Sequence, residues 1–554
     1  MKYMKLFIVC LLCICTLSGC SKSNTSNVTY ENAINIVLSD NDIKIDDAVI
    51  DEDSSKAVYK ANDIIYYEDG KDFTYGEGNS KDAHSKEDAN KHTVVHISKA
   101  GTYKLSGKLS AGQIAIDLGK DAETDPQAVV TLVLDNIDIT CEVAPAIIFY
   151  NVYECGIADE DKASKDVDTS KAGANVIICD GTTNNVNGSY VAKIYKPASV
   201  VLNSDKTKVE DAKKLHKYDA AFYSKMSMNV SGESKNTGVL NINAKNEGLD
   251  SELHLTINGG NININSGNDG INTNEDNVSV TTINNGTLNI VVNGETGEGD
   301  GIDSNGWLVI NGGTVIAQAC ATSADAGIDS DKGIHINGGT VFASGSMLDS
   351  IENGGQTYAV FNFSNKLASN TKLLFKNEKN KAVMDYTIAN SCSMVIFSSS
   401  DLKEGEYTLW NGDKQLGYGG TGVSMGPGGM RPNGNMNMPD GFDPNSFDKN
   451  QFGNGQKPDN LPDNFNPSQF GNIDPNQFGN MKPDGQNRPG NMPDNFDPSQ
   501  FGNIDPNQFG TGQRPDGQNR PNQGQWGNQQ NTTVELTKTF KIEKGANMFS
   551  RISE

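Results

Sequence analysis

The stretch LHLTINGGNININ, residues 253–265, contains two short runs in which apolar and polar residues alternate. Leu255 and Ile257 share one face of the first run, and Ile262 and Ile264 share one face of the second. A period of two is typical of a β-strand that buries one face. The Asn-Gly-Gly between the two runs predicts a turn. The stretch therefore indicates two short strands joined at a corner.

The turn belongs to a repeat. INGG or INNG recurs with its asparagine at Asn258, Asn284, Asn311 and Asn337, which gives spacings of 26, 27 and 26 residues. Each copy is followed by another short apolar run. A repeat of this length made only of strands and turns predicts a solenoid, because one unit cannot bury its own apolar face.

Among solenoids and propellers, the sequence favours an all-β parallel β-helix. A leucine-rich repeat would show a regular leucine template, and a WD propeller would need a longer repeat. Neither pattern is present. Roughly eight to ten coils fit between Thr93 and Ser350 if each repeat forms one coil. The asparagines of the INGG turns would then stack as a structural ladder at one corner.

Composition divides the chain into six predicted segments. The segments are a lipoprotein signal peptide (1–19), a tether and N-terminal region (20–92), the β-helix (93–350), strands of a C-terminal cap (351–416), a disordered low-complexity insertion (417–531) and closing cap strands (532–554). The insertion is rich in Gly, Pro, Asn and Gln, and it has too few aliphatic residues to order itself. Inside the β-helix, residues 206–221 are the main departure from the strand pattern, and they suggest a short helix or a loop.

The N-terminus predicts export. Two lysines precede the short apolar run LFIVCLLCICTL, which is too short for a transmembrane helix, and Leu-Ser-Gly-Cys ends at Cys20. Small residues before a cysteine resemble the bacterial lipobox, so we expect Cys20 to carry lipid. The protein would then lie on the extracellular face of the cell membrane, held by its lipid anchor.

The net charge argues against one class of partner. The net charge of -24 argues against nucleic acid, which needs a basic surface.

Five cysteines follow Cys20, and their odd number and spacing match no disulfide scaffold or zinc site. Their apolar surroundings favour buried thiols, although one disulfide stays open; they are Cys141, Cys155, Cys179, Cys320 and Cys392. We expect a monomer.

Acidic turns recur with the same period. The position two residues after a turn glycine, with a looser copy at the end, is occupied by Asp250, Asn272, Asp303, Asp329 and Asp349. A second acid directly precedes the glycine at Glu247, Asp269 and Asp300, but not at Ala326. Stacked coils would place these side chains in columns at ~4.8 Å, where like charges repel.

Two interpretations of the acidic column stay open. Carboxylate and amide oxygens are the ligands that calcium prefers, so the column predicts calcium sites formed by these eight residues. Alternatively, the Asp and Asn residues serve only as turn formers that bond their own backbone.

Signs of catalysis are few, and no catalytic residue is assigned. The sequence has no HExxH motif, nucleophile elbow or Ser-His-Asp order, and His254 and His335 are outward positions that need no ligand role. A calcium-assisted lyase would need a basic residue beside the metal. Lys225, at the matching corner one coil before Asp250, keeps that alternative open, although a surface lysine paired with the acids explains it as well.

Beyond these patterns the chain resembles a known family. GTYKLSGKLSAGQIAID, VVTLVLDNIDIT, PAIIFYN, the DGID and INGGT coils, and SSSDLKEGEYTLWNG are similar to bacterial, largely clostridial, carbohydrate-binding-domain proteins. The resemblance covers about residues 93–410 and the final strands. It implies a right-handed parallel β-helix with bound calcium, similar in architecture to pectate lyases, that binds plant cell-wall polysaccharide. No sugar-contact motif can be matched, and Ala326 and Asn272 depart from the acidic pattern.

The sequence therefore predicts a lipid-anchored protein that binds polysaccharide without cleaving it. The weak candidates for stacking on sugar rings are Tyr150, Tyr223 and Trp307. A calcium-dependent pectate-type lyase and a surface adhesin for a protein ligand are the alternatives.

The lipid anchor is testable by fractionation. Cys20→Ala removes the thiol that would carry lipid, so we expect the variant to leave the membrane fraction while its expression stays normal. Continued membrane association of a normally expressed variant would contradict the lipoprotein prediction.

Overall fold

The computed structural model describes residues 30, 32–422 and 535–554, all within one compact unit. The predicted signal peptide, Cys20 and nearly all of the predicted insertion lie outside the described residues. The described chain is all-β, and its helical parts are short: α1 (Lys86–Ala89) and three turns of 3-10 helix (Lys120–Thr124, Glu160–Lys162, Pro197–Ser199). No helix in this part of the chain is long and apolar enough to span a membrane.

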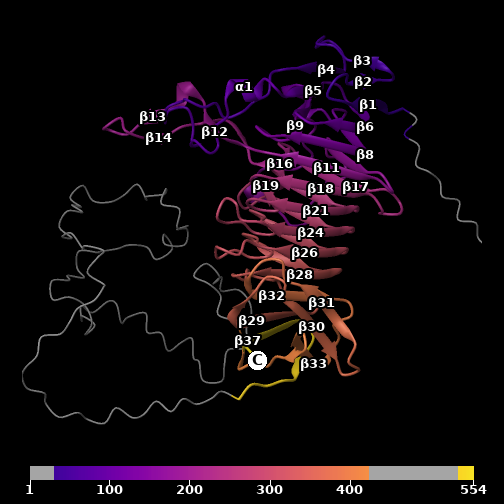
Figure 1. The fold of residues 1–554 in the computed structure, drawn as a ribbon, viewed down its shortest axis with the longest axis vertical. Helices are drawn as coiled ribbons and strands as arrows, with labels where there is room; N and C mark the ends of the chain where they lie inside the picture. Colours follow the sequence, from indigo (N-terminus) through magenta and orange to yellow (C-terminus); the bar gives the residue numbers. More distant parts are fainter. Residues whose placement is uncertain (1–29, 31, 423–534) are drawn as a thin grey trace, which may run out of the picture. The chain divides into compact units, whose positions relative to one another are not determined.

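Three ladders of parallel strands form the body (Figure 1). The first ladder comprises β5 (Thr93–Ile97), β7 (Gly112–Asp117), β9 (Ile147–Asn151), β16 (Ala220–Ser224), β19 (Glu247–Ser251) and β22 (Ile271–Thr273). The second comprises β8 (Val130–Cys141), β10 (Ala174–Ile178), β17 (Met228–Gly232), β20 (His254–Ile257), β23 (Val280–Ile283), β25 (Trp307–Ile310) and β27 (Gly333–Ile336). The third runs from β8 through β11 (Thr183–Gly188), β18 (Val239–Ala244), β21 (Asn261–Ser266), β24 (Thr287–Val292), β26 (Thr314–Gln318) and β28 (Thr340–Gly345).

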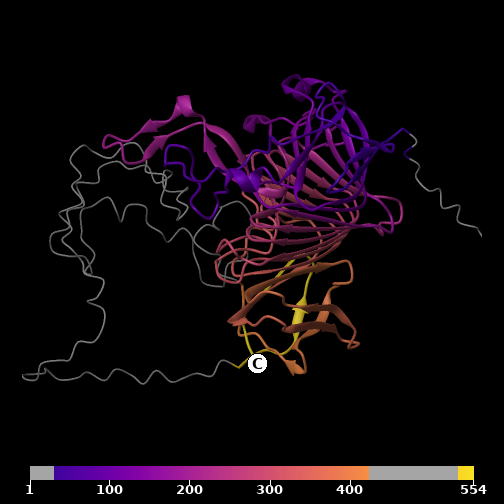
Figure 2. The same ribbon diagram turned by 45° about the horizontal axis from the view of Figure 1, so that its top comes forward.

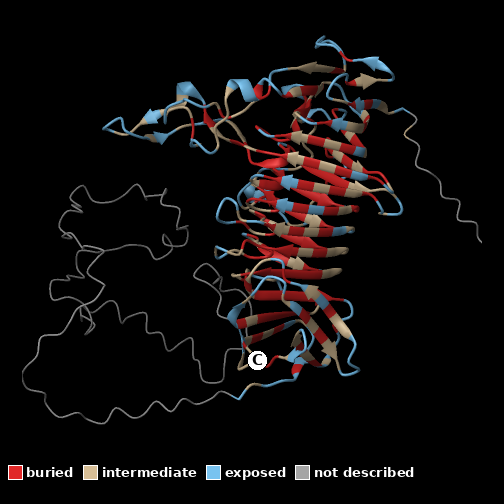
Figure 3. Ribbon diagram, in the orientation of Figure 1, coloured by how far each residue is buried: buried red, intermediate tan, exposed pale blue. Residues whose placement is uncertain are grey.

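The register of the ladders follows the repeat of the sequence. Ile257 pairs with Ile283, Ile283 with Ile310, and Ile310 with Ile336, each one INGG repeat further along the chain. These four isoleucines are at most 1 % exposed. Because equivalent residues stack directly, one apolar position per repeat becomes a continuous buried column (Figure 3).

The N-terminal strands extend this body. β1 (Ile34–Leu38) pairs in parallel with β6 (Gly101–Leu109), which pairs in parallel with β8. A small hairpin, β2 (Lys44–Ile45) and β3 (Ala48–Val49), adds to β1, and β4 (Val58–Ala61) pairs antiparallel with β5.

Residues 191–218 leave the body as an arm (Figures 1 and 2). β12 (Val191–Tyr195) pairs antiparallel with β15 (Lys214–Tyr218), and β13 (Val201–Leu202) with β14 (Val209–Asp211). The helix or loop that the sequence suggests at residues 206–221 is therefore wrong, because this lysine-rich segment finds strand partners just upstream.

Antiparallel strands follow the last coil and form a second core. β28 pairs antiparallel with β32 (Cys392–Ser399), which pairs with β29 (Tyr358–Leu367). The remaining cap strands are β30 (Lys372–Asn377), β31 (Ala382–Thr387), β33 (Gly405–Asn411), β34 (Lys414–Gln415), β35 (Gly420–Thr421), β36 (Phe540–Ile542) and β37 (Ala546–Ile552). Phe361, Phe375, Phe540 and Phe549 pack together in this core. β35 still pairs with β37, so the ordered cap extends past residue 416.

The structure tests two further predictions, one on the cysteines and one on His254. All five cysteines are free, and four of them are buried while Cys155 is half-buried. His254 sits on the outer side of β20 but is only 3 % exposed, and its Nδ1 accepts the backbone N–H of Val280 at 3.1 Å. The histidine is therefore outward on its strand yet covered.

Candidate functional site

The outer side of the first ladder carries the predicted acidic column. Leu249 and Ile271 point into the core, so their neighbours Asp250 and Asn272 point outward, directly in register with each other. The column continues to Asp303 and Asp329, because Ile271, Ile302 and Ile328 form bridges between successive coils.

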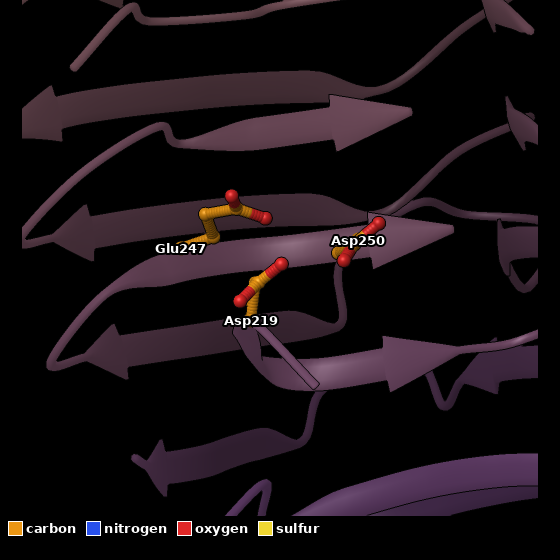
Figure 4. Close-up of side chains that lie close together, drawn as sticks. All are labelled: Asp219, Glu247 and Asp250. Carbon is orange, nitrogen blue, oxygen red and sulfur yellow. The ribbon is translucent and has the colours of Figure 1, made fainter. Parts of the chain in front are cut away.

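One acidic cluster, here the Asp219 cluster, consists of Asp219, Glu247 and Asp250. Carboxylate oxygens of the three residues lie within 4.8 Å of one another, and all three side chains are buried. Figure 4 shows Asp219, directly before strand β16, beside Glu247 and Asp250 of the neighbouring strand β19. The sequence prediction missed Asp219 because it lies in no glycine turn. Its signal was its place directly before Ala220, which is the register partner of Glu247.

Burial dominates the electrostatics of this cluster. Loss of solvent raises the pKa of Glu247, with the Asp250 charge as the next cause. Loss of solvent also raises the pKa of Asp250, with Glu252 next. The pKa of Asp219 is raised by burial too, although Lys217 Nζ lies 2.6 Å from its Oδ2 and favours the charged form.

Hydrogen bonds satisfy only part of the cluster. Asn274 Nδ2 donates to both Asp250 oxygens at 3.0 Å, and Asn272 Nδ2 donates to Glu247 Oε1 at 3.2 Å. Glu247 Oε2 and Asn272 Oδ1 are buried and have no hydrogen-bond partner among the described residues. A buried oxygen without a partner costs about 1–3 kcal/mol. Two such oxygens beside three buried carboxylates fit a hard divalent cation.

A second group, here the Asp303 cluster, consists of Asp300, Asp303 and Asp329. Their carboxylate oxygens also lie within 4.8 Å of one another, and the side chains are half-buried. Burial, followed by the charge of Asp349, raises the pKa of Asp329 to about 8. Asp349 lies at the edge of this group, where its Oδ2 accepts the backbone N–H of Ser330 at 3.1 Å.

Two of the acids that precede a turn glycine also have a structural contact. Asp269 Oδ1 accepts the backbone N–H of Asp300 at 2.7 Å, and Asp300 Oδ1 accepts that of Ala326 at 2.6 Å. Each carboxylate thus ties its own coil to the next one. The predicted column accordingly divides into two clusters, with Asp269 in neither.

The basic residue beside the acids is not the one expected. Lys225 Nζ donates to Glu123 Oε1 at 2.8 Å and to Asn151 Oδ1 at 3.3 Å. Lys217, from the arm strand β15, is the lysine that contacts the Asp219 cluster. Periodicity could not reveal this, because the arm interrupts the repeat.

Two of the three aromatic candidates line one cavity of about 610 Å³ on the outer side of the first ladder. Tyr150 is half-buried there, whereas Tyr223 is 1 % exposed and donates its O–H to Glu252. Tyr223 packs edge-on against Tyr218, with ring centroids 5.3 Å apart. Because the side chain is buried, its ring is not accessible for stacking on a sugar. Trp307 lies on β25 of the second ladder, away from the lining of this cavity.

The predicted asparagine ladder forms at the corner after the second ladder. Asn284 Nδ2 donates to Asn258 Oδ1 at 2.8 Å, Asn311 to Asn284 at 2.9 Å, and Asn337 to Asn311 at 2.8 Å. This ladder borders a second cavity of about 670 Å³.

Part of the chain matches a known protein family. Residues 90–354, which include all three ladders and both acidic clusters, match a family described as carbohydrate-binding domain-containing protein. The chain is also similar to a solved structure described as a polysaccharide lyase-like protein from C. thermocellum, in a gadolinium derivative. The identity is 19 %, the TM-score is 0.30, and the match covers 55 % of this chain and 89 % of that one. None of the curated proteins matches the chain.

The buried acids predict that the metal-free protein loses stability as the pH rises. Burial is the main cause that raises the pKa of Asp269 to about 7 and of Asp329 to about 8, from 3.8. The pKa of His254 is lowered by burial, so this histidine opposes the effect at acid pH. Above about pH 7, where histidines are mostly neutral in both states, the two carboxyls still bind more protons in the folded chain than in the unfolded chain, so stability falls between about pH 7 and pH 8. Melting curves in EDTA at several pH values measure how stability changes with pH.

A matched pair of variants controls for the overall charge. Asp269→Asn with Asp329→Asn should flatten the slope, whereas Glu210→Gln with Asp211→Asn, on the exposed part of the arm, should leave it unchanged. A melting temperature that holds level or rises between about pH 7 and pH 8 would contradict the prediction.

Proposed function

We propose that this protein binds polysaccharide at the cell surface and does not cleave it. The match of residues 90–354 to a carbohydrate-binding family carries the proposal. We place the fold among right-handed parallel β-helices, which the three in-register parallel ladders support. A lipid anchor at Cys20 would hold the protein on the extracellular face of the membrane.

We further propose that calcium stabilises the acidic corner. Asp219, Glu247, Asp250 and the Asn272 amide oxygen would hold one ion, and Asp300, Asp303 and Asp329 would hold another. A bound cation supplies positive charge that offsets the repulsion between stacked carboxylates. Asn274 keeps the Asp250 carboxylate oriented, and the backbone N–H of Ala326 does the same for Asp300.

The position of Lys217 favours binding over lyase chemistry. A general base must be unprotonated to take a proton. Burial lowers the pKa of Lys217 and the adjacent Asp219 charge raises it, and the net shift is upward. Without a bound cation, Lys217 therefore stays protonated as a partner of Asp219, and Lys225 is paired with Glu123.

Removal of calcium tests the two proposed calcium sites. We expect EDTA to lower the melting temperature and added calcium to restore it, since a ligand held only by the folded chain adds about 2.7 kcal/mol at one hundred times its Kd. Glu247→Gln with Asp250→Asn should remove the ion of the Asp219 cluster, and Asp303→Asn with Asp329→Asn the other. Titration calorimetry counts the ions that remain in each variant.

The control for these variants is a pair of exposed acids in the cap, Glu404→Gln with Asp413→Asn. This pair also removes two charges, so it separates a specific site from general screening. If chelation leaves the melting temperature of the wild-type protein unchanged, the acids serve only as turn formers and the calcium proposal fails.

A glycan array with and without calcium tests the function itself. We expect binding to plant cell-wall polysaccharides, and no release of unsaturated product when the protein is incubated with polygalacturonate and calcium. An array without any bound glycan, together with capture of a host protein, would replace this proposal with an adhesin. Formation of unsaturated product would replace it with a lyase.

A further inference from the structure

The outer face of the second ladder, bordered by the asparagine ladder, differs from the rest of this acidic protein. Ten residues from the strands and corners line its 670 Å³ cavity, and none of them is charged. The charged lining residues, Lys165, Asp166 and Asp168, all come from one loop. We propose that this uncharged face binds an extended, uncharged glycan chain, an inference that rests on the proposed function and assigns its site.

The asparagine ladder presents a prearranged row of hydrogen-bonding groups. Asn258, Asn284, Asn311 and Asn337 are exposed, and each bond within the ladder uses one N–H of an amide that has two. The second N–H of each amide is left for a ligand. Since the amides already hold one another in place, a ligand does not have to order them.

The spacing of the row suits a linear polymer. Successive rungs are one coil apart, or ~4.8 Å in a β-ladder. This distance is of the same order as the length of one sugar unit in an extended chain. Hydroxyl groups that recur along such a chain can therefore meet successive rungs.

A hydroxyl group of the protein's own chain already bonds to polar side chains of this face. Thr169 Oγ1, from the charged loop, lies 2.7 Å from both Asn229 Oδ1 and Thr256 Oγ1 on this face. Asn229 Nδ2 donates back to the Thr169 carbonyl at 2.8 Å. The loop thus bonds to this face at Asn229 and Thr256, whereas the four asparagines of the ladder remain exposed.

Apolar contacts complete the face. Leu308 and Ile310 of β25 point into the core, so Trp307 and Val309 lie on the outer side. Val309 lines the cavity, and Trp307 lies two residues before it. The register partner of Trp307 on the next coil is Gly333, which has no side chain to cover the indole ring. An aromatic ring of this kind can pack on the apolar C–H face of a sugar.

Titration calorimetry on the full chain tests the inference, with neutral linear hexasaccharides of glucose, xylose and mannose and a hexagalacturonate as probes. We expect at least one neutral probe to bind the wild-type protein. Asn284→Ala with Asn311→Ala should weaken it by about tenfold or more, as expected for two lost hydrogen bonds. Trp307→Ala should weaken it as well.

The third ladder offers a matched control. Asn263 Nδ2 donates to Asn241 Oδ1 at 2.9 Å there, in an asparagine ladder of the same kind on another face. Asn241→Ala with Asn263→Ala should also lower the melting temperature, because it removes bonds of the same type, but it should keep affinity within about twofold.

Three outcomes would overturn the inference. Equal loss of affinity in both asparagine pairs would mean that the ladders act only through stability. Binding of hexagalacturonate alone, abolished by Glu247→Gln with Asp250→Asn, would place the ligand at the acidic corner. Unchanged binding in the Asn284 and Asn311 variant would leave the proposed function intact but place its site elsewhere, whereas a wild-type protein that binds no glycan on the array fails the proposed function itself.

Discussion

The hydrogen bonds between parallel strands of the three ladders fix the register in which residues of successive strands meet. On the next strand, Ile257 meets Ile283, and Asp250 meets Asn272. The free energy of each position therefore depends on how well a residue type packs against its own kind. Apolar residues, amides and carboxylates differ in how well they stack on a residue of the same type.

Isoleucine and asparagine both tolerate a like neighbour. Stacked isoleucines exclude water from the centre of the coils. An asparagine side chain carries a donor and an acceptor, so a column of asparagines bonds to itself without any other partner. Such columns need no ligand for stability, and their unused N–H groups remain available at the surface.

Ionised carboxylates have no hydrogen-bond donor, so a column of them needs donors or positive charges from other groups. The chain supplies several kinds: backbone N–H groups from the next coil for Asp269 and Asp300, the Asn274 amide for Asp250, and the Lys217 ammonium for Asp219. Asn272 interrupts the column and bonds to Glu247. These contacts still leave Glu247 Oε2 and Asn272 Oδ1 unpartnered, which is why a cation is proposed at this corner.

The sequence alone determined the all-β class, the repeat of parallel strands, the inward isoleucines and the asparagine ladder, because each follows from a short period in the chain. It also identified the acids that face outward on the first ladder. Only the tertiary structure decided which of those acids meet. Asp219 and Lys217 reach the corner from an arm that breaks the repeat, Lys225 is drawn to Glu123, and the ring of Tyr223 is buried against Tyr218. A period in the sequence places residues that are one coil apart, whereas contacts made by an arm or loop depend on how it folds back in space.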